Sequence, residues 1–205
     1  MKEFLSTPWK ISLEFRRILC EPYSRFYCAL HGIAWGKGWK IYGCPIIQRH
    51  RESSINIGAG FSCRSWTDSN PLGPYHSLIL STRAKDALLR IGEDVGITGG
   101  TLCAVHRIEI GNRVTIGANT TIVDTDFHPL RPEERLKNPH QGSHAPVFIE
   151  EDVFIGMNSI ILKGVRIGKG SVIGAGSVVT TNVEPGAVYA GNPAVFVRSL
   201  ANKAS

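Results

Sequence analysis

The feature that most constrains the fold is a six-residue period of branched apolar residues, many of them followed by glycine. The period joins Ile110, Ile116 and Ile122, and after an interruption it resumes at Ile149, Ile155, Ile161, Ile167, Ile173 and Val179. A strict short period is typical of a repeat architecture. Three hexads make one triangular coil of eighteen residues, and each repeated residue points inward onto its equivalent in the next coil. The sequence therefore predicts an all-β solenoid, with glycines at corners where a side chain would crowd the bend.

The period also divides the chain into parts. Residues 1–40 lack it and predict an N-terminal amphipathic helical segment, residues 41–190 form the solenoid, and residues 191–205 form a C-terminal tail. The interruption over residues 128–148 predicts a long loop that is inserted in the solenoid.

Smaller irregularities predict further local features. Turn-forming residues are dense over 69–74, where a second loop is expected to leave the coil. Ile110 follows Cys103 by seven residues instead of six, which predicts one extra residue near 107–109, as a bulge at a corner. Residues 195–201 are expected to form a last strand or a short helix.

The N-terminal segment is predicted to be one or two amphipathic helices. Thr7-Pro8 is typical of a helix start, and apolar residues then recur at three- and four-residue steps, with Pro22 expected to kink or break the helix. The simplest interpretation is a cap over the first coil. The alternative is contact with an anionic membrane surface, because basic residues lie among the apolar ones: Lys10, Arg16, Arg17 and Arg25.

Composition narrows the class of partner and the compartment. A net charge of +6 is compatible with nucleic acid, anionic lipid or a phosphorylated ligand, but no zinc finger, RNP motif or basic arm is visible, so nucleic acid is disfavoured. Five scattered cysteines without a C-x-x-C pair predict buried free thiols in a reducing cytosol. Residues 1–12 lack the apolar core of a signal peptide, and the uncharged stretch 26–36 is too short to span a bilayer. We expect a cytoplasmic protein, with association to the inner face of the membrane as the alternative.

Several motifs resemble those of the hexapeptide-repeat acyltransferases, in particular the maltose, galactoside and polysaccharide O-acetyltransferases. These are the hexads of residues 167–179, the pair His128-Pro129 where the loop begins, the return at 145–149 and the end at 191–194. The resemblance implies a left-handed parallel β-helix and a homotrimer with active sites between neighbouring solenoids. It also implies acetyl-CoA as co-substrate, a sugar or polysaccharide acceptor, and no metal.

The resemblance makes His128 the general base. An imidazole, with an ordinary pKa of about 6.5, is suited to taking a hydroxyl proton at neutral pH, and such catalysis contributes roughly 10²–10⁴-fold. Asp124 and Asp126 are the acids that are candidates to orient it, since they share one face of an extended segment that His128 continues if the strand persists. The alternatives for Asp126 are a bond to a sugar hydroxyl and a turn cap. His106 lies about one coil earlier and is a candidate for substrate binding.

The loop itself carries little further signal. Residues 132–134 are typical of the first turn of a helix, with acids favoured by the helix dipole. His140 and His144 are expected to be solvated.

The resemblance also implies where coenzyme A binds, which is a groove beside the coils that follow the loop. The candidates are Met157, Gly174, Ala175, Thr180 and Thr181, and Arg198 for a CoA phosphate.

Three other functions stay open at this point. One is an N-acetyltransferase acting on an amino-sugar or an antibiotic. Another is a zinc enzyme of the γ-carbonic-anhydrase type, for which His106, His128 and His144 supply the number of ligands but not that family's local motif. The third is a non-catalytic solenoid that acts as a scaffold.

Overall fold

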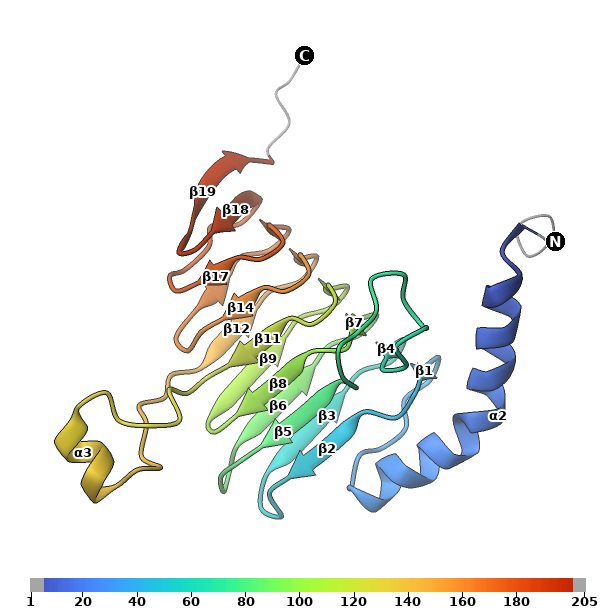
Figure 1. The fold of residues 1–205 in the computed structure, drawn as a ribbon, viewed down its shortest axis with the longest axis horizontal. Helices are drawn as coiled ribbons and strands as arrows, with labels where there is room; N and C mark the ends of the chain where they lie inside the picture. Colours follow the sequence, from blue (N-terminus) through green and yellow to red (C-terminus); the bar gives the residue numbers. More distant parts are fainter. Residues whose placement is uncertain (1–5, 201–205) are drawn as a thin grey trace.

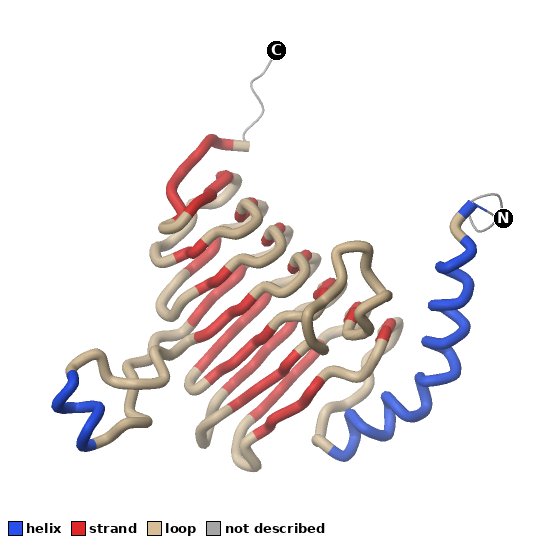
Figure 2. The backbone as a smooth tube through the Cα atoms, viewed as in Figure 1, coloured by secondary structure: helices blue, strands red, loops and turns tan. Residues whose placement is uncertain are grey.

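The computed structural model describes residues 6–200 and consists of a stack of triangular coils between an N-terminal helix and a C-terminal hairpin (Figures 1 and 2). Three sheets form the sides of the stack. Consecutive strands pass from one sheet to the next, and each pairs in parallel with the strand one coil away. This arrangement confirms the predicted solenoid of parallel strands.

The strands of the three sheets, in chain order, are as follows. Sheet A contains β1 (Lys40–Tyr42), β4 (Ser62–Arg64), β7 (Gly96–Thr98), β10 (Thr115–Ile116), β13 (Phe154–Ile155), β16 (Val172–Ile173), β18 (Ala187–Gly191) and β19 (Ala194–Ser199). Sheet B contains β2 (Ile46–Arg49), β5 (Ile79–Thr82), β8 (Thr101–Ala104), β11 (Thr121–Val123), β14 (Ile160–Ile161) and β17 (Val178–Val179). Sheet C contains β3 (Ser54–Ile57), β6 (Leu88–Ile91), β9 (Arg107–Ile110), β12 (Val147–Ile149) and β15 (Arg166–Ile167).

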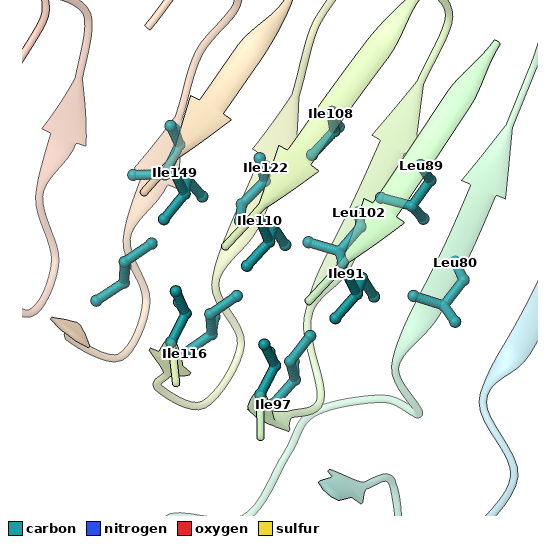
Figure 3. Packing of buried hydrophobic residues seen from close by; sticks show 14 of the residues in the cluster. Leu80, Leu89, Ile91, Ile97, Leu102, Ile108, Ile110, Ile116, Ile122 and Ile149 are labelled. Carbon is teal, nitrogen blue, oxygen red and sulfur yellow. The ribbon is translucent and has the colours of Figure 1, made fainter. Parts of the chain in front are cut away.

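The core is a set of columns of inward-pointing aliphatic side chains. Ile91, Ile110 and Ile149 are in register on three successive strands of sheet C and are each about 2% exposed. Ile97 and Ile116 form the corresponding column on sheet A, as Figure 3 shows. Each buried side chain of this size contributes about 1.5–3 kcal/mol. The period of six is thus the spacing that returns a branched side chain to the interior on each face.

The glycines that follow the inward residues serve the spacing between coils. A Cβ on Gly117 would lie 2.5 Å from the backbone nitrogen of Met157, and one on Gly156 would lie 2.5 Å from that of Ala175. The left-handed backbone of the same corner occurs further along, at Asn119 (φ 62°) and Asn158 (φ 57°). The glycines are therefore required because the next coil approaches closely. The sequence interpretation assigned them to the bend, but at these two corners the asparagines adopt the left-handed backbone that makes it.

Helix α2 (Pro8–Leu30) is a single helix that continues through Pro22, although its axis bends along its length (Figure 1). Its inner side contacts the first coil. The Tyr42 hydroxyl donates a hydrogen bond to the Glu14 carboxylate, and Ser24 and Cys44 lie 3.3 Å apart at their Oγ and Sγ atoms. Its outer side exposes a run of large apolar residues that are 49–67% accessible: Trp9, Ile11, Phe15, Ile18, Leu19, Tyr23, Phe26 and Leu30. The helix therefore covers the first coil with one face and leaves an apolar face outward.

The irregularity that the seven-residue step predicted at a corner near 107–109 falls in the corner between β8 and β9, at residues 105–106. Residues 107–109 themselves belong to the regular strand β9, which pairs without a register shift to both neighbours. The C-terminal prediction of a strand is confirmed by β19, which pairs antiparallel with β18; residues 201–205 lie outside the described part of the chain.

Two predictions from composition can also be compared with the structure. All five cysteines are free, but the prediction that they are buried is correct only for Cys28, Cys63 and Cys103, since Cys20 and Cys44 are partly exposed. Burial raises the pKa of the Cys63 thiol to about 12 and that of Cys28 to about 11. Within residues 6–200 no helix combines the length and the apolar character needed to cross a bilayer.

Candidate active site

His128 lies at the corner between sheets B and C, just after the end of β11. The strand ends at Val123, and Phe127 has a left-handed backbone with φ 61°. Because of this turn, the extended alternation that would have placed Asp124, Asp126 and His128 on one face does not continue to the histidine.

The inserted loop is closed at its base by a short antiparallel contact. Thr125 bridges His144, the Asp126 N–H donates to the Ser143 carbonyl at 2.9 Å, and the Ala145 N–H donates to the Asp124 carbonyl at 2.9 Å. Beyond this base the loop projects from the coils and carries α3 (Pro132–Lys137), as Figure 1 shows. The predicted first turn of a helix at 132–134 is confirmed.

The loop returns close behind the backbone of His128. A Cβ on Gly142 would lie 2.6 Å from the backbone nitrogen of His128 and 2.6 Å from the carbonyl carbon of Phe127. A glycine is therefore needed at this crossing, and the returning strand of the loop fixes where the His128 backbone lies.

A hydrogen bond to the loop sets the tautomer of His128. Its Nδ1 contacts the backbone carbonyl oxygen of Pro139. Since a carbonyl only accepts, Nδ1 carries the hydrogen, and Nε2 of the neutral ring is left with a free lone pair. The ring is exposed to solvent, with the His140 ring 6.0 Å away between centroids. This is the protonation pattern that a general base requires.

Asp124 is fully buried and is bonded to the backbone of the preceding coil. Its carboxylate accepts hydrogen bonds from the N–H groups of Val105, His106 and Arg107 at 2.7, 2.7 and 2.6 Å. Those residues form the corner that contains the extra residue of the repeat. Within the described chain the bond that orients the His128 ring comes from Pro139, and the Asp124 carboxylate is used to hold this corner.

Asp126 lies at the loop base and is partly exposed. Its carboxylate accepts a hydrogen bond from the Ser143 hydroxyl at 2.7 Å and pairs with the Lys163 ammonium at 3.2 Å. Its carbonyl also accepts the His128 N–H at 2.7 Å. Asp126 therefore contacts His128 through the backbone, and its side chain joins both ends of the loop to the next coil.

The sequence interpretation did not include Lys163, Pro139 or Gly142. The register offered a signal for Lys163, because Ile122 pairs with Ile161 and so brings the residues two positions further on to the same corner. The contacts of Pro139 and Gly142 depend on the path of the loop, which the period does not determine.

His106 and His144 form a second pair of histidines, beside the loop base. The His106 and His144 rings are 5.5 Å apart between centroids, so one coil of separation does bring His106 to this corner. Residues 6–200 contain no group of three potential metal ligands from His, Cys, Asp and Glu side chains.

The candidate CoA residues occupy two corners of the coil and the C-terminal hairpin. Met157, Gly174 and Ala175 lie at the corner between sheets A and B, where the Gly176 N–H donates to the Met157 carbonyl at 2.8 Å. Thr180 and Thr181 follow β17 at the corner between sheets B and C and are exposed. Arg198 is exposed on β19, opposite Val188. The outer face of sheet B thus separates the two groups of candidates within one chain.

An open groove of about 380 Å³ runs over the outer face of sheet B toward the loop. Its lining residues come from β2, β5, β8 and β11 and from the two corners next to them: Gln48, Ile79, Ser81, Arg83, Thr101, Cys103, Thr121, Val123 and Phe127. Phe127 directly precedes His128, so the groove ends beside the proposed base.

Comparison with known proteins first defines the class of repeat. Residues 146–181 match the family model described as the hexapeptide repeat of succinyl-transferase. Among curated proteins, the galactoside O-acetyltransferase of Lactococcus lactis subsp. lactis (strain IL1403) is 44% identical over 93 residues, which are 45% of this chain and 44% of that protein. The 2,3,4,5-tetrahydropyridine-2,6-dicarboxylate N-acetyltransferase of Clostridium perfringens (strain 13 / Type A) is 54% identical over 61 residues, which are 30% of this chain and 26% of that protein. The chain thus matches less than half the length of these relatives.

Solved structures show the same fold. A maltose O-acetyltransferase from Clostridium difficile 630 superposes with a TM-score of 0.50 at 22% identity, covering 93% of this chain and 89% of that chain. The N-acyltransferase AntD from Bacillus cereus superposes with a TM-score of 0.52 at 20% identity, covering 80% of this chain and 81% of that chain. Together with the repeat, these matches confirm the resemblance to the hexapeptide-repeat acyltransferases.

Proposed function

We propose that this protein transfers the acetyl group of acetyl-CoA to a hydroxyl of a sugar or polysaccharide, with His128 as the general base. The observation that carries the proposal is the Nδ1 contact to the Pro139 carbonyl, which leaves Nε2 free to accept a proton. The curated relatives support the reaction class, since both are named as acetyltransferases.

The proposed step follows from that tautomer. Nε2 of His128 takes the acceptor hydroxyl proton as the oxygen attacks the thioester carbonyl, so that a C–O bond forms and the C–S bond breaks. The departing sulfur then receives the proton from Nε2, and the imidazole returns to its neutral form. The Pro139 carbonyl also stabilises the imidazolium that exists between the two transfers, because Nδ1–H donates to it more strongly when the ring is charged.

The second candidate is N-acetylation, which the Clostridium perfringens relative favours by its name. The same base would take the proton of an attacking amine. The discriminating experiment measures CoA thiol release by the purified protein with a panel of sugars, oligosaccharides and amines. O-acetylation predicts release with acceptors that lack an amine, whereas release only with amines would overturn it in favour of N-acetylation. A protein that neither binds acetyl-CoA nor releases thiol with any acceptor would contradict both.

We also propose that the coil is left-handed and that the protein is a homotrimer, as in the family that it resembles. The distribution of the CoA candidates supports the trimer. The corner with Met157 and the corner with Thr180 are on opposite sides of sheet B. In a trimer, the Met157 corner of one solenoid would lie close to the Thr180 corner of its neighbour. The groove that binds coenzyme A would then lie between subunits, with Arg198 available to a CoA phosphate. Sedimentation equilibrium tests the assembly, and an active monomer would exclude it.

The outward face of α2 is the basis for a proposed contact with an anionic bilayer surface on the cytoplasmic side. The helix carries four basic residues against Glu14 and Glu21, so its charge complements anionic lipid while its apolar residues enter the interface. Threefold symmetry would place three such helices at one height, which increases avidity. Co-sedimentation with vesicles that contain anionic lipid is expected to exceed that with neutral vesicles. Equal recovery with both, or none, would contradict it, and Phe15→Ser with Leu19→Ser is the variant expected to lose binding.

A further inference from the structure

A basic hollow lies at the N-terminal end of the solenoid, where the end of α2 meets the first two coils. It has a volume of about 500 Å³ and is lined by His31, Ile47, Gln48, Arg49, His50, Thr82 and Arg83. Four of these seven side chains are basic and none is acidic. An opening of this composition concentrates positive potential and favours an anionic group.

The basic groups are arranged as hydrogen-bond donors. His50 Nδ1 accepts a hydrogen bond from the Glu52 N–H at 3.2 Å, so Nε2 of its neutral ring carries the hydrogen. Arg49 uses one nitrogen, Nη1, to donate to the Ser53 carbonyl at 2.9 Å, which fixes its guanidinium. The nearest acid in sequence, Glu52, pairs with Lys85 at 3.6 Å.

Arg83 is the more available of the two arginines in the hollow. Its side chain is exposed, and among residues 6–200 it makes neither an ion pair nor a side-chain hydrogen bond. Its backbone N–H donates to the Ala104 carbonyl at 2.9 Å, which places it at the corner between sheets B and C. The guanidinium therefore retains all five donors for a ligand.

The hollow is continuous with the groove that ends beside His128. Gln48 and Arg83 line both. Moreover, Arg83 directly follows β5 and His128 follows β11 at the same edge of sheet B, in which the strand order is β5, β8, β11. The register Ser81–Cys103–Val123 places Thr125 two strand spacings from Arg83, which is about 10 Å along the sheet, and His128 follows Thr125 by three residues in the loop.

We propose that this hollow binds a phosphate or carboxylate group of the acceptor, so that the enzyme acts on an acidic saccharide whose reacting hydroxyl reaches His128. The inference rests on the proposed O-acetylation and names its substrate class. Arg83 is the specificity-determining contact, with His50 and Arg49 as supporting donors. A glycosyl phosphate and a uronic acid offer the same chemistry, and the experiment distinguishes them.

The test compares acceptors that differ only in the anion: a neutral disaccharide, its uronate counterpart and its phosphorylated counterpart. We expect wild-type kcat/KM to be at least tenfold higher for one of the acidic acceptors. Arg83→Gln is expected to remove that preference through a higher KM, because an exposed charge-assisted contact contributes to binding and not to the step at His128. Arg51→Gln, an exposed arginine of the same corner that does not line the hollow, is the matched control and should keep the preference.

The outcomes are separable from those of the reaction itself. Titration calorimetry with glucuronate and with inorganic phosphate measures the hollow without catalysis, and Arg83→Gln should weaken one of them at least fivefold. If the protein transfers no acetyl group but binds the anion through Arg83, the proposed function fails and the hollow stands as an anion site. Equal activity of Arg83→Gln and wild type on all acceptors would overturn the inference. A rise in the KM for acetyl-CoA alone would overturn it too, since the hollow would then serve the CoA phosphates.

Discussion

Replacing Asp124 by asparagine should lower stability strongly and leave catalysis intact. The carboxylate is fully buried and accepts three backbone hydrogen bonds from residues 105–107. Hydrogen bonds to a charged acceptor contribute about 1.5–3 kcal/mol each. An asparagine keeps one acceptor oxygen but turns an NH₂ group toward at least one of the three donors, which is then left unpaired.

The expected cost follows from those bonds. All three interactions become neutral or are lost, so the free energy of unfolding should fall by about 3–5 kcal/mol. For a chain of this size about 1 kcal/mol corresponds to ~2–4 °C, which gives a decrease in Tm of roughly 6–20 °C. Asp126→Asn is the control, because its ion pair with Lys163 is partly exposed and should be worth less than about 1 kcal/mol.

Thermal denaturation followed by circular dichroism gives the stability, and CoA thiol release at a temperature where both variants are folded gives kcat. We expect a large loss of Tm for Asp124→Asn with kcat within about threefold of wild type, because the tautomer of His128 is set by Pro139. A variant of unchanged Tm whose kcat falls by more than about a hundredfold would refute the structural role and return Asp124 to the orientation of the base.

Three further outcomes are expected. Gly117→Ala should cost more than about 2 kcal/mol in urea denaturation, because its Cβ would lie 2.5 Å from the backbone of the next coil, while a tolerance within about 0.5 kcal/mol would argue that the coils can separate locally. Lys163→Met should raise the rate at which a protease that does not cleave after lysine cuts the loop, since Asp126 loses its ion pair. An unchanged rate of cleavage would contradict a role of this ion pair in holding the loop base. Burial raises the pKa of Glu14, but its bonds to Tyr42 and to a neighbouring arginine outweigh this and hold the pKa below 4.5, so the stability it contributes is present above pH 4.5 and is lost as the pH falls through the lowered value. Urea midpoints measured from pH 6 downward should therefore fall less steeply for Glu14→Gln than for wild type.

The solenoid could be predicted from the sequence because one physical requirement recurs. Each inward position needs a branched aliphatic side chain, and Ile91, Ile110 and Ile149 meet it on one face of three successive coils. The reason why glycines are needed could not be predicted from the sequence. A period shows where small residues occur, but it does not show whether the bend or the next coil excludes a side chain. The contact distances at Gly117 decide this in favour of the next coil.

The site was predictable only in part. The sequence places His128 where the period is interrupted, and the structure adds the contact with Pro139 that leaves Nε2 as the acceptor. The partners of Asp124 could not be anticipated, since they depend on the exact backbone path at the corner of the preceding coil, which a period alone does not determine. The pairing register could have placed Lys163 at this corner, whereas it could not have predicted the contacts within the loop.

The measurement that decides the role of His128 most directly is kcat at saturating acetyl-CoA for wild type and His128→Gln, with the affinity for CoA measured on both proteins. We expect His128→Gln to bind CoA with unchanged affinity and to lose about 10²–10⁴-fold in kcat. Activity of His128→Gln within a few-fold of wild type would contradict the assignment of His128 as the base.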